Sequence, residues 1–202
     1  MKKTTLLFGI LVVIAGIMLI FFEPITDWRI NRLSQSVVES SEASGMSSDK
    51  VDTHYDFDKV KELSFSSLLT LPNADNVEGI GIISMPEVDM TLPILDGLSV
   101  ANLMAGAGTM KQDQVPGQGN YSIAGHNWRD RTTLFSPLHR AEEGMSIFLT
   151  IDGETYEYSV STIQTVKPTR IDIIEDQDEP LLTLVTCNHD GSKRLIVQAT
   201  LV

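Results

Sequence analysis

The chain of 202 residues contains a single cysteine, Cys187, and its chemistry is the natural starting point. A lone cysteine cannot form an intrachain disulfide, and it excludes the C-x-x-C motifs of zinc and redox sites. A thiolate is a nucleophile that can attack a carbonyl carbon. Cys187 is therefore either a reactive nucleophile or a buried, inert thiol, a state that free cysteines often adopt.

Arg194 is the residue that we expect beside this thiol. Cys187 ends an apolar stretch, Arg194 begins the next one, and NHDGSK separates them. The Asp190-Gly191 pair in this segment is a strong turn signal, and pairing outward from it places Cys187 opposite Arg194. Opposite residues of antiparallel strands share a face, with Cβ atoms about 4.5 to 5.5 Å apart. A guanidinium there favours the thiolate or stabilises an oxyanion.

A thiol nucleophile needs a proton partner, and histidine is the usual one near neutral pH. The four histidines are His54, His126, His139 and His189. His54 falls in a serine-rich stretch, and His139 is most simply a surface residue of a short helix. His189 shares the face of Cys187 but abuts the turn, whereas His126 ends the strand NYSIAGH, where a ring can project over a groove. The residues alone favour His126 and leave His189 open.

The elements that must position these side chains are predicted by short runs rich in β-branched and aromatic residues. Two segments, 99–108 and 133–144, are predicted as helical instead. Seven or eight strands at this spacing indicate a mostly β fold with short helices, either an antiparallel barrel or a sandwich. The predicted strands are 77–85, 90–95, 120–126, 145–151, 154–166, 181–187 and 194–202.

The amino terminus predicts a transmembrane helix. Residues 4–22 carry no charge, and a helix of that length spans roughly the 30 Å hydrocarbon core. A cleaved signal peptide is the alternative, but no small-x-small site ends the apolar run. Lys2 and Lys3 precede the span, so the positive-inside bias leaves residues 1–3 in the cytoplasm and places the rest outside the cell.

Residues 23–65 are predicted to form an extracellular tether, followed by a catalytic domain at 66–202. Residues 34–54 are rich in serine and poor in large apolar groups, so they bury too little surface to offset the entropy of ordering. A short amphipathic helix is expected at 55–63. The net charge of −12 argues against a nucleic-acid partner. The sequence contains no phosphate loop and no H-E-x-x-H motif.

Three features together resemble a known family: TLVTC at 183–187 followed by Arg194, NYSIAGH at 120–126, and an amino-terminal anchor. They are similar to the class A sortases of Gram-positive bacteria, and the resemblance covers roughly residues 66–202 plus the anchor. It implies an eight-stranded sortase-type β-barrel whose catalytic residues are His126, Cys187 and Arg194. It implies no cofactor.

The resemblance also implies a reaction. A membrane-anchored cysteine transpeptidase, with its catalytic domain outside the cell, would cleave LPXTG sorting signals of surface proteins between Thr and Gly. Cys187 would attack the Thr carbonyl, and an amine of the lipid-linked peptidoglycan precursor would resolve the thioester. His126 would protonate the leaving amine and deprotonate the incoming one, while Arg194 would stabilise the oxyanion. In the family the active form is a minor ionisation state.

Three further positions match the family's substrate-binding residues. Ala124 and Thr183 correspond to positions that line the signal groove in relatives, although small or β-branched strand residues are common. Thr186 lies on the opposite strand face from Cys187. Its backbone is a candidate oxyanion contributor, and a core-facing threonine is the alternative.

One departure from the family concerns metal binding. Some class A members bind calcium through acidic residues before the histidine strand, but here residues 110–120 contain one carboxylate, Asp113, and Lys111 adds positive charge. A hard cation needs several oxygen ligands, so we predict no calcium site. Acidic residues gather at 174–180, in a long loop from 167 to 180 that is either a lid over the groove or a solvated face.

Two other functions stay open at this stage. In a membrane-tethered cysteine peptidase, water would resolve the thioester at the same residues. A non-catalytic wall-binding module would bind sorting peptides without forming an adduct at Cys187.

Overall fold

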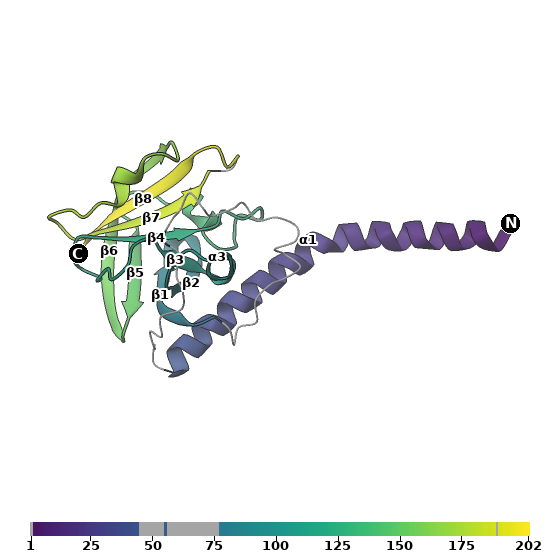
Figure 1. The fold of residues 1–202 in the computed structure, drawn as a ribbon, viewed down its shortest axis with the longest axis horizontal. Helices are drawn as coiled ribbons and strands as arrows, with labels where there is room; N and C mark the ends of the chain where they lie inside the picture. Colours follow the sequence, from purple (N-terminus) through teal and green to yellow (C-terminus); the bar gives the residue numbers. More distant parts are fainter. Residues whose placement is uncertain (1, 45–54, 56–76, 189) are drawn as a thin grey trace.

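The computed structural model describes residues 2–44, 55, 77–188 and 190–202. Within these residues, eight strands close into a barrel with a long amino-terminal helix against one side (Figure 1). The order around the barrel is β1-β2-β3-β4-β7-β8-β6-β5. The predicted eight-stranded, mostly β barrel is therefore confirmed, and the sandwich is excluded.

Three connecting segments form 3-10 helices, which are written η. The strands are β1 (Gly79–Met85), β2 (Met90–Leu95), β3 (Ala107–Thr109), β4 (Asn120–Gly125), β5 (Ser146–Ile151), β6 (Glu154–Val166), β7 (Leu181–Cys187) and β8 (Arg194–Leu201). The helical elements are α1 (Lys2–Ser44), α3 (Val100–Ala105), η3 (Pro86–Val88), η4 (Ser136–Arg140) and η5 (Ile171–Ile174).

Strand β3 was missing from the sequence prediction. It occupies the end of segment 99–108, which was predicted as helical throughout and is helical only in α3. Three residues, one of them glycine, carry no readable alternation, so only pairing with β2 and β4 identifies this strand. Segment 133–144 likewise contains only the short helix η4.

The prediction of a purely antiparallel barrel was wrong. β2 pairs with β3, and β4 with β7, in parallel. The chain leaves β4, forms β5 and β6, and re-enters beside β4 as β7, and such a crossover connection permits the parallel direction. Strand patterns in a sequence do not contain this information, because pairing direction depends on the path of the connection.

The strands β4, β7 and β8 are buried on both faces. Leu182 and Leu184 of β7 point into the main barrel core, while Val185, on the other face, belongs to a smaller cluster with Ile173 of η5. The β6–β7 loop thus covers the outside of the barrel beside the end of β7. Burial on both faces explains why β7 and β8 are nearly continuous runs of apolar residues.

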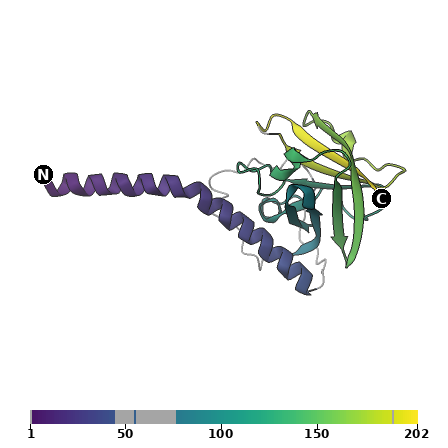
Figure 2. The same cartoon turned by 180° about the vertical axis from the view of Figure 1, so that it is seen from behind.

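The second half of α1 packs against β1, β2 and α3 (Figure 2). Ile30 is fully buried in the main core cluster, and Leu33 and Val37 join a separate cluster with Leu95. A Cβ at Gly79 of β1 would collide with Ser41 Oγ, so this glycine permits the helix to approach the sheet closely.

Residues 34–44 therefore do not behave as the predicted tether, because they are helical and lie partly against the barrel. An apolar stripe at residues 30, 33 and 37, which is one face of a helix, runs from before the serine-rich stretch into it, and the polar composition after residue 33 obscured this pattern. The helix predicted at 55–63 lies outside the described residues, apart from Tyr55. The domain boundaries at 1–3, 4–22, 23–65 and 66–202 stay predictions.

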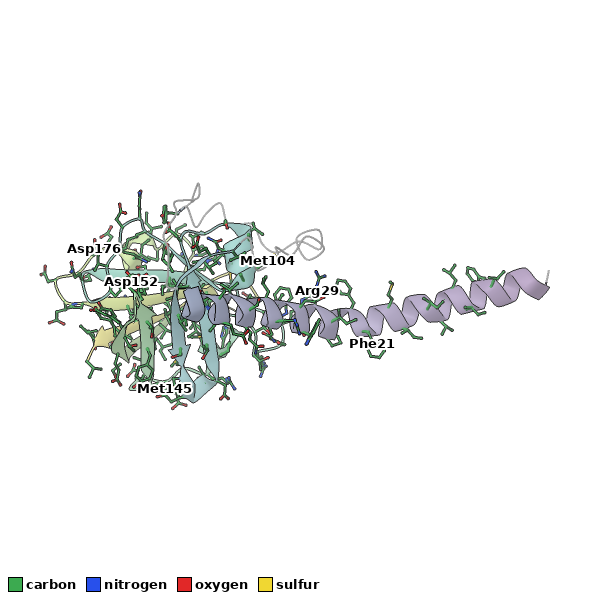
Figure 3. All side chains as sticks on the ribbon, turned by 90° about the horizontal axis from the view of Figure 1, so that it is seen from below. Phe21, Arg29, Met104, Met145, Asp152 and Asp176 are labelled. Atoms are coloured by element: carbon green, nitrogen blue, oxygen red, sulfur yellow. The ribbon has the colours of Figure 1, made fainter. Side chains whose placement is uncertain are left out.

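The first half of α1 extends beyond the barrel and exposes apolar side chains, including Phe21 (Figure 3). Among the described residues, however, no helix combines the length and apolar character needed to cross a membrane. The predicted transmembrane span at 4–22 is therefore not supported by the structure.

Candidate active site

The last hairpin places Cys187 and Arg194 as the sequence predicted. Cys187 is the final residue of β7, Arg194 is the first of β8, and the two are direct partners in the ladder. The Asn188 N–H donates to the Lys193 carbonyl at 3.1 Å, and the Lys193 N–H donates to Asn188 Oδ1 at 2.9 Å. The predicted register is confirmed. Arg194 Nη1 donates to the Gly191 and Lys193 carbonyls at 3.2 Å each, which holds the guanidinium beside the hairpin.

His126 follows the end of β4, which lies beside β7. The last pair in this parallel register is Ala124 with Val185, and continuing it by two residues brings His126 level with Cys187. The Thr186 hydroxyl donates to the Gly125 carbonyl at 2.8 Å, so the two strand ends are fastened together immediately before the candidate pair. The structure thus brings all three sequence-predicted catalytic residues to one end of the neighbouring strands β4, β7 and β8.

Two further contacts hold the residues around His126. Asn127 Nδ2 donates to the Asn188 carbonyl at 3.2 Å, which links the segment after β4 to the segment after β7. The Phe135 N–H donates to the His126 carbonyl at 3.0 Å. A Cβ at Gly125 would lie 2.6 Å from Phe135 Cγ, so only glycine lets the buried Phe135 ring pack directly beneath this strand end.

The environment of the His126 imidazole favours its neutral form. Burial lowers the pKa of His126 to about 4, because desolvation penalises the charged ring. Its Nε2 is buried and has no hydrogen-bond partner among the described residues. A neutral ring with an available Nε2 is equipped to accept a proton.

An apolar groove runs from Arg194 along the outside of the barrel. It has a volume of about 240 Å³, and one wall consists of Val185 and Ile196 from β7 and β8. The opposite wall is the β6–β7 loop, with residues Lys167, Pro168, Arg170, Ile171, Ile173 and Ile174. Of the three candidate catalytic residues, Arg194 lines this groove, whose mainly apolar walls suit an extended apolar chain segment.

The three predicted substrate-binding residues are buried in the described structure. Ala124 lies in the cluster beneath η5, and the Thr183 hydroxyl donates to Asn120 Oδ1 at 2.7 Å. Thr186 is fully buried, and its hydroxyl donates to the Gly125 carbonyl. Of the two roles considered for Thr186, its side chain fits the core-facing one. These residues form the base of the site, and their role in binding substrate stays a prediction.

Asn120 is a structural residue that sequence reasoning missed. Its Nδ2 donates to the Ile173 carbonyl at 2.8 Å and to the Glu175 carbonyl at 3.1 Å, so this buried amide holds the middle of the β6–β7 loop at two neighbouring points. An asparagine and a serine within an otherwise apolar strand, NYSIAG, were the available signal. Buried polar side chains need partners, and here the loop supplies them.

The acid-rich loop is also fastened by an ion pair. Lys111 Nζ lies 2.5 Å from Asp176 Oδ1, and the ammonium holds the pKa of that carboxyl below its usual range. Asp176 lies on the side of the domain opposite to the projecting helix (Figure 3). Among the described residues, no group of three or more His, Cys, Asp or Glu side chains is placed to hold a metal ion.

The described part of the structure places none of the other three histidines at this site. His139 is half-buried in η4, the 3-10 helix that follows the His126 loop. His54 and His189 lie outside the described residues, so the preference for His126 over His189 stays a prediction.

Comparison with known proteins identifies the family. Residues 83–202 match the family described as the sortase domain. The chain is 34% identical to sortase A of Listeria monocytogenes over 97% of its own length and 89% of the relative. It is 36% identical to sortase A of Streptococcus agalactiae, covering 95% of this chain and 82% of the relative.

The chain belongs to the sortase family. The similarity to class A members, first suggested by TLVTC and NYSIAGH, is confirmed. Sortases are cysteine transpeptidases that anchor surface proteins. The crystal structure of Listeria monocytogenes sortase A superimposes with a TM-score of 0.59 at 39% identity, covering 61% of this chain and 87% of that one. Sortase A of Corynebacterium diphtheriae gives 0.61 at 29% identity and 83% of each chain.

Proposed function

We propose that this sortase cleaves LPXTG sorting signals between Thr and Gly, using Cys187 as nucleophile, His126 as acid and base, and Arg194 as oxyanion stabiliser. The observation that carries the proposal is the meeting of three strand ends. Cys187 and Arg194 are ladder partners, and His126 follows β4 two residues after Ala124, just as Cys187 follows Val185, the β7 partner of Ala124.

The protonation state of His126 sets the first step. The neutral imidazole takes the thiol proton, and the thiolate sulfur forms a bond to the Thr carbonyl carbon. The carbonyl oxygen becomes an oxyanion, which the Arg194 guanidinium stabilises. The imidazolium then gives its proton to the Gly nitrogen as the carbon–nitrogen bond breaks, which leaves a thioester and a free amine.

The second half of the reaction reverses these roles. An incoming amine attacks the thioester carbonyl, His126 accepts the proton that the amine loses, and the Cys187 sulfur departs as a thiolate as the new amide forms. The imidazolium then returns its proton to this sulfur, which restores the starting thiol and neutral ring. Burial disfavours the imidazolium, so the charged form of His126 arises only transiently in each half-reaction.

The groove of about 240 Å³ beside Arg194 is the proposed binding site for the signal. Its walls of Val185, Ile196 and the β6–β7 loop suit the Leu-Pro portion, because apolar side chains gain most from leaving water. The Thr carbonyl would then lie at the groove end that contains Arg194.

The proposed acceptor is an amine of the lipid-linked peptidoglycan precursor, and the proposed clients are secreted proteins that bear the signal. This assignment places the barrel outside the cell membrane. Fractionation of cells, with protease treatment of intact protoplasts, tests the location. A chain recovered only from the cytosol and resistant to external protease would contradict it.

The direct test of activity incubates the full chain with a sorting peptide and a short amino-terminal glycine or alanine peptide, followed by mass spectrometry. We expect cleavage after Thr, a thioester on Cys187 and a ligated product. Cys187→Ala should abolish all three while retaining the fold. Cleavage without ligation would indicate the cysteine peptidase instead, and peptide binding without any adduct would indicate the non-catalytic module.

The histidine assignment has its own test. His126→Ala should abolish turnover, whereas His189→Ala should leave most of it. The reverse pattern would overturn the assignment.

A further inference from the structure

The loop after His126 closes on itself next to the candidate site. The Trp128 N–H donates to Ser136 Oγ at 2.5 Å, and this hydroxyl donates to the Trp128 carbonyl at 2.9 Å. Asn127 forms an isolated bridge with Leu134, so the loop begins and ends immediately beside His126. Displacement of Trp128 would therefore be transmitted over two residues to the imidazole.

The outer side of this loop is attached to the amino-terminal helix. Trp128 Nε1 donates to Asp27 Oδ1 at 2.7 Å, a contact between residues 101 positions apart. Asp27 lies one turn before Ile30, the residue of α1 that is buried in the main core. The carboxylate is thus carried by a helix that is itself fixed on the barrel, and hydrogen bonds to a charged acceptor are stronger than neutral ones.

Trp128 also packs against the main core cluster, to which Ile30 of α1 belongs. A cavity of about 420 Å³ lies beside the loop, lined mostly by residues of α1 and by residues 89–92, with Thr132 and Leu134 from the loop. The hydrogen bond to Asp27 adds a directional contact to this packing and fixes the orientation of the indole ring relative to α1.

We propose that Asp27 and Trp128 are positioning residues, through which the helix α1 fixes the His126 ring relative to Cys187. The amino-terminal helix is then a functional part of the catalytic unit. This inference rests on the proposed function, since His126 is taken as the acid and base.

The test compares Trp128→Phe and Asp27→Ala in the full chain. Trp128→Phe removes the ring N–H and retains an aromatic ring, and Asp27→Ala removes the acceptor. Trp28→Phe is the matched control, because Trp28 is exposed on the same helix and contacts Arg32 instead. Each test variant should lower kcat about 10-fold with KM changed less than about 2-fold, because a small misplacement of a reacting group costs rate rather than binding. The control should match the wild type.

Two readouts separate positioning from simple loss of stability. The double variant should be no slower than either single variant, because both remove the same interaction. A ring released from its buried position gains water, so the pKa of His126, followed by NMR of its ring protons, should rise from about 4 towards 6.5 in Trp128→Phe. Urea unfolding identifies any variant that is merely unfolded.

Wild-type kcat and an unchanged His126 titration in Trp128→Phe would overturn the inference and leave the proposed function intact. Additive losses in the double variant would also overturn it. If the wild type forms no ligated product, the proposed function fails, and the His126 titration still decides whether α1 positions the ring.

Discussion

Lowering the pH from 7 to 4 should destabilise the folded protein through His126. In the unfolded chain the ring has its ordinary pKa of 6.5, and burial lowers the pKa of the folded ring to about 4. Between these values the unfolded state binds a proton that the folded state does not bind. The stabilisation by the neutral ring is therefore complete above pH 6.5 and is lost as the pH falls towards 4.

The magnitude follows from the same two values. The gap between 6.5 and about 4, at about 1.36 kcal/mol for each pH unit, corresponds to about 3 kcal/mol. The residue retains partial contact with solvent, which screens the charged form, so we expect about 2 kcal/mol in the free energy of unfolding.

The assay is urea unfolding of the wild type and His126→Gln at pH 7, 6, 5 and 4. Glutamine binds no proton in this range, and the titration of carboxylates affects both proteins, so it cancels in the comparison. The difference in unfolding free energy between the two proteins should change by about 2 kcal/mol across the series. A difference that stays constant with pH would show that the ring is not held neutral by burial.

Three substitutions test other parts of the site. Thr186→Val leaves the Gly125 carbonyl without its buried donor, so unfolding free energy should fall by about 1–3 kcal/mol and kcat should fall with it; unchanged urea midpoints would argue against this role. Gly125→Ala places a Cβ 2.6 Å from the Phe135 ring, so thermal unfolding should report a loss of about 1–3 kcal/mol from overpacking. Arg194→Lys should lower kcat/KM about 10-fold or more at an unchanged melting temperature, because an ammonium lacks the planar guanidinium fork; full activity would remove Arg194 from the oxyanion role.

Local pattern was sufficient to predict much of the site. The register of Cys187 with Arg194 follows from a turn signal and two apolar strands, because antiparallel pairing around a short connection is a local property. The sequence physics also favoured His126 over His189, but the decisive position of His126 depends on the parallel pairing of β4 with β7. That pairing joins distant segments, and no local spacing encodes it.

The remaining errors have the same origin. Residues 23–65 were interpreted as a tether because residues 34–54 are polar, yet Ile30, Leu33 and Val37 of this segment pack against the barrel. The roles of Asn120 and Trp128 likewise depend on partners far along the chain, Ile173 and Asp27. Residue type showed that these side chains could form hydrogen bonds, but only the tertiary structure shows which groups are their partners.

The fastening of β4 to β7 joins residues 61 positions apart, and the guanidinium arrives later still, on the final strand. Assembly of the candidate site therefore requires that β7 pair with β4 on one side and with β8 on the other. A folding intermediate that lacked either pairing would present Cys187 without one of its two proposed partners, so the proposed chemistry depends on closure of the barrel.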